Sequence, residues 1–203
     1  MEKGYSALVV VILIILSIVL LVRWFKNQNK KKVILFQEWG AKMGFQHSQT
    51  KKFFYRFNYL EGEVNGNKVR IYESLSGSGD NQTVVCNFTI TPSPFNFSFR
   101  IGKEHFFSKT GKLLGMKDVE VGDEKFDKIF LLKSKEESQL KSVINYKIQS
   151  ELMQIKDALK STIQVDENFI KYSTIQPVMR ERQLEEFERV FNFALLLVKE
   201  NKR

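Results

Sequence analysis

The first 25 residues differ from the rest of the chain in the pattern of their side chains. Between Tyr5 and Val22 there is no charged residue, and only Ser6 and Ser17 are not apolar. As a helix this stretch would be roughly 27 Å long, close to the thickness of a bilayer's hydrocarbon core. Every face of such a helix is apolar, as expected for a segment in lipid. We therefore predict a transmembrane helix in residues 1–25.

Aromatic and cationic residues follow the apolar stretch. Trp24 and Phe25 suit the membrane interface, where aromatic rings are enriched. They stand where a signal peptide would carry small residues for cleavage, so we predict an uncleaved signal-anchor. Flanking cations stay on the cytoplasmic side. This predicts a single-pass protein of the cell membrane, with its N-terminus outside and the rest of the chain in the cytoplasm. The predicted membrane-surface residues are Arg23, Trp24, Lys26, Lys30, Lys31 and Lys32.

Residues 26–32 are predicted to be a basic juxtamembrane linker. Two interpretations of its cations stay open. They act only as a topology signal, or they also attract anionic lipid head groups, at about 1 kcal/mol for each cation near the surface. In both cases the lipid bilayer is the first partner that the sequence predicts.

After residue 32 the pattern changes to an amphipathic helix and then to strands. Val33, Phe36 and Met43 share one helical stripe, and Gly44 is the predicted stop. Asn65-Gly66 predicts a tight hairpin turn. Apolar, β-branched or alternating runs that predict strands occupy residues 53–63, 69–75, 83–90 and 95–101.

The second half of the chain adds helices to this strand-rich pattern. Ser134 is the predicted N-cap of one helix, residues 162–166 and 169–175 form a predicted hairpin, and 180–203 is a closing helix. We predict an α+β fold: an N-terminal transmembrane helix followed by a curved antiparallel sheet of about six to eight strands, packed by about three or four helices. The predicted cytoplasmic domain covers 33–203.

The closing helix is apolar on more than one side. One face is sufficient to pack on the sheet: Phe187, Phe191, Ala194 and Val198. A second set of apolar residues points away from that stripe: Phe193, Leu196 and Leu197. Either the domain covers this second set itself, or the set is an interaction surface for a protein partner, another copy of the chain or the bilayer. The helix is too short to span a membrane.

The composition excludes several functional classes. The chain has 203 residues, with 32 Lys and Arg against 23 Asp and Glu and a net charge of +9. Its single Cys excludes a disulfide framework or a Cys-based zinc site, and its 2 His exclude most His-rich metal centres. The cations are spread along the chain or concentrated beside the apolar segment, and the aromatic residues alternate as core residues. No nucleic-acid partner is therefore predicted.

No catalytic motif occurs in the sequence. Cys86 lies in an apolar strand-like run, where a buried and unreactive thiol is expected. The feature closest to an active site is a group of acids interleaved with lysines: Asp118, Glu120, Asp123, Glu124 and Asp127. It is either a solvated turn or an oxygen-rich site for Mg²⁺ or Ca²⁺. We predict no catalytic, cofactor-binding or metal-ligating residues and no cofactor.

Two short motifs follow the anchor in a recognisable order: Gly62-Glu63-x-x-Gly66-x-x-x-Arg70-x-Tyr72 and Gly122-Asp123-x-x-Phe126-Asp127-x-x-Phe130. With the anchor and its basic flank, this order resembles uncharacterised, membrane-anchored bacterial domain families of unknown function. The likeness covers most of residues 33–200. It implies no catalytic residues.

Together these patterns favour a single-pass membrane protein with a cytoplasmic binding or scaffolding domain. The alternative is a membrane-tethered hydrolase or metal-dependent enzyme that uses the Asp118–Asp127 acids. Geometry separates the two hypotheses, because an enzyme needs polar groups that converge in a concave pocket.

Overall fold

The computed structural model describes residues 2–52, 55–107 and 115–201. The helices are α1 (Glu2–Met43), the 3₁₀ turn η1 (Gly79–Asn81), α2 (Glu104–Phe107), α3 (Glu124–Asp127), α4 (Glu137–Val143), α5 (Tyr146–Gln154) and α6 (Glu181–Glu200). The strands are β1 (Gln46–Lys52), β2 (Tyr55–Val64), β3 (Asn67–Ser76), β4 (Thr83–Thr91), β5 (Phe99–Gly102), β6 (Lys117–Val119), β7 (Leu131–Ser134), β8 (Ile163–Val165) and β9 (Ile170–Ser173).

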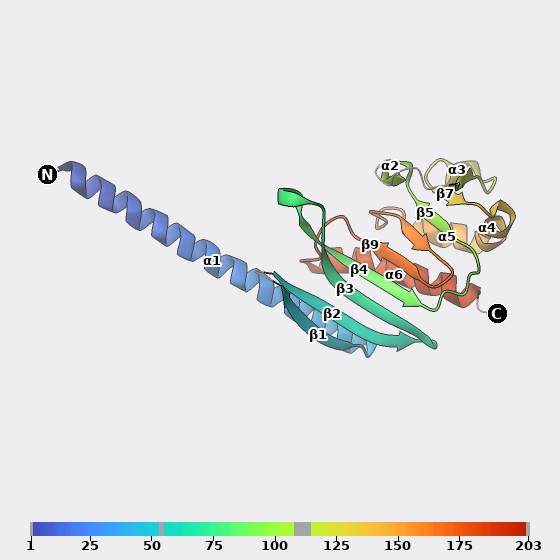
Figure 1. Cartoon of the computed structure of the whole chain (residues 1–203), viewed down its shortest axis with the longest axis horizontal. Coiled ribbons are helices and arrows are strands. Elements are labelled where there is room, and N and C mark those ends of the chain that lie inside the picture. Colours follow the sequence, from blue (N-terminus) through green and yellow to red (C-terminus); the bar gives the residue numbers. More distant parts are fainter. Residues whose placement is uncertain (1, 53–54, 108–114, 202–203) are drawn as a thin grey trace.

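The described strands form one antiparallel sheet in the order β1-β2-β3-β4-β9-β8-β5-β7-β6. In Figure 1 the sheet twists across the molecule with α6 behind it, and α1 extends away as a long rod. The α+β prediction, with an N-terminal apolar helix and an antiparallel sheet, is confirmed. The described sheet has nine strands, more than the sequence indicated, because the predicted runs included neither β1 at one edge nor the short strands β7 and β6 at the other.

Helix α1 is a single helix of 42 residues that runs from the apolar segment into the domain. Residues 26–32, expected to be a linker, are helical throughout. They contain neither Gly nor Pro, and Lys and Gln are good helix formers, so nothing in this stretch interrupts the helix. The predicted stop at Gly44 is confirmed. Its φ of +70° lies in the left-handed region that favours glycine, and the Phe45 N–H donates to the Gly40 carbonyl at 2.8 Å.

The β2–β3 hairpin confirms the Asn65-Gly66 turn. Both residues have positive φ, at 51° and 78°, which is the backbone that a two-residue hairpin turn requires. The turn sets the register in which Tyr59 lies opposite Tyr72. It also decides which side chains of β3 face the helices and which face the open side of the sheet.

Two local predictions were wrong. Phe95 and Phe97 are buried as expected, but only Phe99–Gly102 of that run is a strand, because Phe95 and Phe97 pack through edge-on ring contacts after a proline-rich bend. Ser134 ends β7 rather than capping a helix. Its hydroxyl accepts a bond from the Glu136 N–H at 3.0 Å and donates to the Ser98 carbonyl at 3.1 Å, and α4 begins at Glu137.

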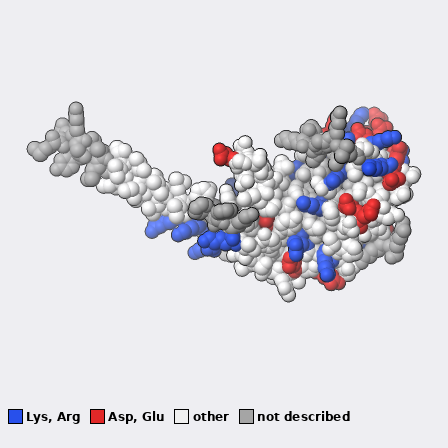
Figure 2. Space-filling view, in the orientation of Figure 1, with Lys and Arg blue, Asp and Glu red and all other residues white. Residues whose placement is uncertain are grey.

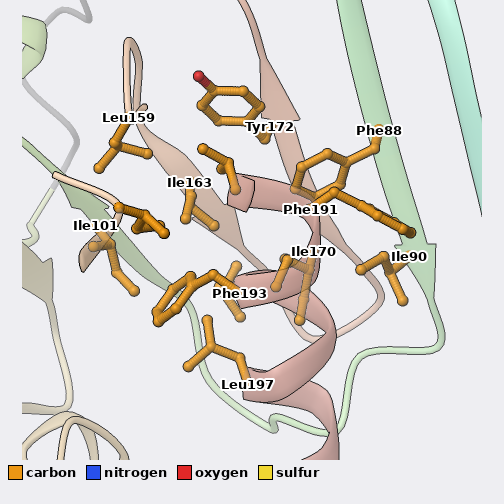
Figure 3. Packing of buried hydrophobic residues seen from close by; sticks show 14 of the residues in the cluster. Phe88, Ile90, Ile101, Leu159, Ile163, Ile170, Tyr172, Phe191, Phe193 and Leu197 are labelled. Atoms are coloured by element: carbon orange, nitrogen blue, oxygen red, sulfur yellow. The ribbon is translucent and has the colours of Figure 1, made fainter. Parts of the chain in front are cut away.

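The core lies between the sheet and α6 (Figure 3). Phe88 on β4 stacks with Tyr172 on β9 at 5.6 Å and meets Phe191 of α6 edge-on at 5.4 Å. Trp39 of α1 lies 5.8 Å from Phe187 of α6 between ring centroids. Helices α1 and α6 therefore pack side by side on the same face of the sheet, and neither covers the opposite face, which we call the open face.

Candidate functional site at the junction of anchor and domain

The apolar half of α1 lies outside the domain. Its described large apolar side chains between Val10 and Val22 are 43–59% exposed, and the helix is long and apolar enough to cross a membrane. Trp24 and Phe25 follow, with exposed fractions of 56% and 59% and rings in edge-on contact. A stretch with this much apolar surface in water would be strongly unfavourable, so the anchor interpretation agrees with the geometry.

Four of the five predicted membrane-surface cations form an exposed collar on α1: Arg23, Lys26, Lys30 and Lys31. Within the described residues, none of the four makes an ion pair with an acid. Figure 2 shows Lys and Arg atoms gathered on α1 where the helix enters the domain. The collar thus presents unneutralised positive charge on both sides of Trp24 and Phe25 along the helix.

The prediction that Lys32 is a membrane-surface residue was wrong. It is only 6% exposed, and its ammonium lies 3.0 Å from Glu73 Oε1, on a carboxylate whose side chain is fully buried. Lys32 falls on the stripe of α1 that continues to the buried Phe36 and Trp39, so the helix turns it toward the sheet rather than toward lipid. It belongs to the interior and not to the membrane surface.

Glu73 occupies an inward position of β3, on the same side as Val69 and Ile71. Its Oε2 accepts two hydrogen bonds from Asn58 on β2, at 2.9 Å from the backbone N–H and 2.7 Å from the side-chain amide. Its Oε1 has no hydrogen bond of good geometry among the described residues, so the Lys32 ammonium supplies the neutralising contact there. A buried carboxylate requires such a partner.

The network continues to the edge strand β1. Asn58 Oδ1 accepts a hydrogen bond from Gln49 Nε2 at 2.9 Å and lies 3.0 Å from His47 Nε2. One charged residue of the anchor helix is thereby connected to three neighbouring strands. Sequence reasoning missed this site. The available signal was Glu73 itself, an acid in the inward register of an otherwise apolar alternation.

The open face of the sheet carries a separate hollow of about 670 Å³ over β2, β3 and β4. Tyr59 and Tyr72 lie parallel in it, with ring centroids 6.3 Å apart and an interplanar angle of 9°. Beside them Arg70 Nε donates to Glu61 at 2.6 Å. The hollow therefore offers flat aromatic surface next to charged and hydroxyl groups, a combination that suits binding more than acid–base chemistry.

The Asp118–Asp127 acids serve the local fold. Asp123 caps α3 by accepting from the Lys125 and Phe126 N–H groups, and Asp127 accepts from the Val121 and Gly122 N–H groups. Asp118 pairs with Lys133. Within the described part of the chain, no three His, Cys, Asp or Glu side chains lie close enough together to hold a metal ion. The carboxylates are splayed into turns and ion pairs rather than gathered in a pocket.

Cys86 is fully buried in β4. Burial, with the nearby Glu73 carboxylate as a smaller cause, raises the pKa of its thiol well above the usual value. A thiol with a raised pKa has little thiolate at neutral pH and is a poor nucleophile. The environment of Cys86 agrees with the unreactive thiol expected from the sequence.

The predicted interaction surface on α6 also needs correction. Phe193 and Leu197 are 4% and 0% exposed, and Leu196 is half-buried against the same core. In Figure 3 Phe193 and Leu197 point toward the side of the sheet that carries Ile101 and Ile163. The sheet covers more than one stripe of the helix, because β8 and β5 continue it beyond β9. The alternative that the domain itself covers these residues is the one that the structure favours.

No protein-family model matches the sequence, and the search of curated proteins gives no match. A solved structure does match the fold: "crystal structure of the mycobacterial trehalose monomycolate transport factor A, TtfA". The TM-score is 0.56, with 11% sequence identity over 83% of this chain and 94% of that one. At this identity the comparison shows a similar fold, and the similarity extends over most of both chains.

Proposed function

We propose that this chain is a single-pass membrane protein whose cytoplasmic domain is a non-catalytic binding or scaffolding module held beside the bilayer. The observation that carries the proposal is the continuity of α1, which passes from an apolar, exposed segment into the domain core without a break. A continuous helix fixes the distance of the domain from the apolar segment and the direction in which it lies. The domain is therefore held close to the membrane rather than on a flexible tether.

Two further observations support the proposal. The exposed collar of α1 places its cations on the domain side of the apolar segment, which favours a cytoplasmic domain. The fold is similar to that of a protein named as a transport factor for trehalose monomycolate. An accessory role in a process at the membrane is consistent with that similarity, and the hollow over β2, β3 and β4 provides a surface for a protein partner or a ligand.

The test combines extraction and topology. After membranes are washed with alkaline carbonate, the full chain should stay in the pellet, and a reporter fused after Arg203 should be active only if it is of the type that requires cytoplasm. Release by carbonate would contradict the anchor. Activity of only a periplasm-requiring reporter would reverse the orientation while leaving the anchor intact.

A further inference from the structure

A second cationic feature lies at the end of the β1–β2 hairpin, away from the collar in sequence. Lys51 of β1 and Arg56 of β2 are exposed and stand directly opposite each other in the register. We call these two residues the hairpin cations. Among the described residues neither makes an ion pair with an acid. Like charges placed opposite each other destabilise a strand pair, so a nearby negative charge would stabilise this arrangement.

The path of the chain brings the hairpin cations back to the level of the collar. After the turn at Gly44, β1 runs antiparallel to α1, and Figure 1 shows the far end of β1 and β2 beside the helix where it leaves the domain. Gly40 of α1 and Leu60 of β2 lie at the same position along the axis of α1. A Cβ atom added to Gly40 would lie only 2.7 Å from Leu60 Cδ2. Leu60 is in turn opposite His47.

From that level the height of Lys51 can be estimated. Four strand residues from His47 to Lys51 span about 13 Å, which corresponds to about nine residues of α1. Lys51 therefore lies near the level of Lys31, about 9 Å beyond Phe25 along the helix. This distance is comparable to the Debye length of about 8 Å at physiological ionic strength. The Lys32–Glu73 ion pair holds α1 to β3, and the two hydrogen bonds from Asn58 to Glu73 connect this contact to β2, which fixes this height.

An exposed aromatic residue precedes Arg56 in β2, and its side chain lies on the opposite face of the hairpin because side chains alternate along a strand. Tyr55 is 44% exposed and stacks on the buried Phe57, with ring centroids 6.0 Å apart. Tyrosine is enriched at membrane interfaces because its ring is apolar and its hydroxyl is polar. A cation pair and an exposed tyrosine at the height of the head groups match the chemistry of an anionic lipid surface.

We propose that the hairpin cations, Lys51 and Arg56, bind the anionic phospholipid head groups of the bilayer that holds α1. The domain is then held on the membrane at two points, the collar and the hairpin cations. This inference rests on the proposed function, because it requires α1 to be in the bilayer. Its consequence is a fixed orientation of the open sheet face relative to the membrane.

The experiment uses the full chain in nanodiscs of phosphatidylcholine, with or without phosphatidylglycerol. A fluorophore on Thr50→Cys, next to Lys51, reports contact through quenching by lipids that carry a head-group nitroxide; unlabelled Cys86 is buried. Quenching should be stronger with phosphatidylglycerol. Lys51→Glu with Arg56→Glu should reduce it to the phosphatidylcholine level, since each cation near an anionic surface strengthens association about fivefold.

The matched control is Lys125→Glu with Lys135→Glu, which makes the same change in charge at two exposed sites elsewhere in the domain, one on α3 and one directly after β7. It should keep the wild-type quenching. A neutral variant, Lys51→Gln with Arg56→Gln, should show a smaller loss of quenching than the charge reversal. It tests the inference also if the charge reversal impairs folding. Quenching that is independent of lipid charge, or unchanged by both hairpin variants, would overturn the inference. A chain that does not enter the nanodiscs would instead overturn the proposed function.

Discussion

At the residue scale, the Lys32–Glu73 pair is the feature with the largest expected energetic effect. Both side chains are almost completely withdrawn from water, and Glu73 holds Asn58 in place through two hydrogen bonds. A buried ion pair adds little net stability compared with apolar residues, but removal of one partner leaves an uncompensated charge. We therefore expect its role to be the specification of how α1 packs on the sheet.

The prediction is that Lys32→Met destabilises the domain by about 3–5 kcal/mol. Lys32→Met combined with Glu73→Gln should recover most of that loss, because Gln keeps an acceptor for Asn58 and carries no charge. Lys31→Met, at the neighbouring exposed position, is the control and should have little effect. Denaturant unfolding measures all three variants. Equal stability of the single and double variants would show that the charge on Glu73 is compensated in another way.

Tyr172 gives a prediction of pH dependence. Burial raises its pKa from 10.0 to about 12, and its hydroxyl accepts a hydrogen bond from the Lys160 N–H at 3.2 Å. The unfolded chain loses this proton first, so the stability that Tyr172 contributes is complete below about pH 10 and is lost as the pH rises toward 12. Tyr172→Phe should show a smaller alkaline loss than wild type in unfolding experiments at several pH values. Identical pH profiles of wild type and Tyr172→Phe would contradict the contribution of Tyr172 to the alkaline loss of stability.

At the element scale, α1 contains both the segment that is long and apolar enough to cross a membrane and a part of the domain core. Its segment from Lys32 to Met43 contributes the buried Lys32, Phe36 and Trp39, so the functional boundary of the domain lies before residue 33. Helix α6 provides the other half of this helical layer. Its second apolar set is covered by the extended sheet, which explains why a helix with so much apolar surface is compatible with a single copy of the chain.

This dual role of α1 can be tested with two fragments. A fragment of residues 27–203 should unfold cooperatively and be more stable than one of residues 33–203 by about 3 kcal/mol, because only the longer one can pair Lys32 with Glu73. The longer fragment with Lys32→Met should resemble the shorter one. If both unmodified fragments unfold at the same denaturant concentration, the boundary at residue 33 is adequate and the ion pair is dispensable.

At the scale of the whole molecule, the fold separates a covered face from an open one. Helix α6 and the part of α1 from Lys32 to Met43 pack on one face of the sheet, and the hollow around Tyr59 and Tyr72 lies on the other. A domain held at a fixed height by α1 would present this open face in a constant orientation. Such geometry suits a protein that brings a partner or a ligand to a membrane site.

The corresponding prediction concerns adduct formation in intact membranes. A photoreactive phenylalanine analogue at Tyr59 should give a discrete adduct, whereas the same analogue at Tyr146, which is 83% exposed on α5, should not. Tyr72→Ala should lower the yield at position 59, since it removes the stacked ring. Gel mobility and mass spectrometry identify the adducts. The same adducts at both positions would exclude the hollow as the specific binding surface.

The sequence alone determined the elements whose signals are local. The uncharged apolar run marks the anchor, Asn65-Gly66 marks the hairpin, and the closing helix follows from its apolar spacing. These signals depend on neighbouring residues, on turn chemistry and on a repeat of two or 3.6 residues. The α+β class followed from the order of such elements.

The tertiary structure decided which charges and apolar residues meet a partner far along the chain. Lys32 had the same local context as Lys31, and only the packing of α1 on the sheet makes one buried and the other exposed. Phe193 and Leu197 became core residues because β8 and β5 extend the sheet around α6. Burial depends on contacts between residues distant in sequence, and the register and packing that create those contacts are set by the whole fold.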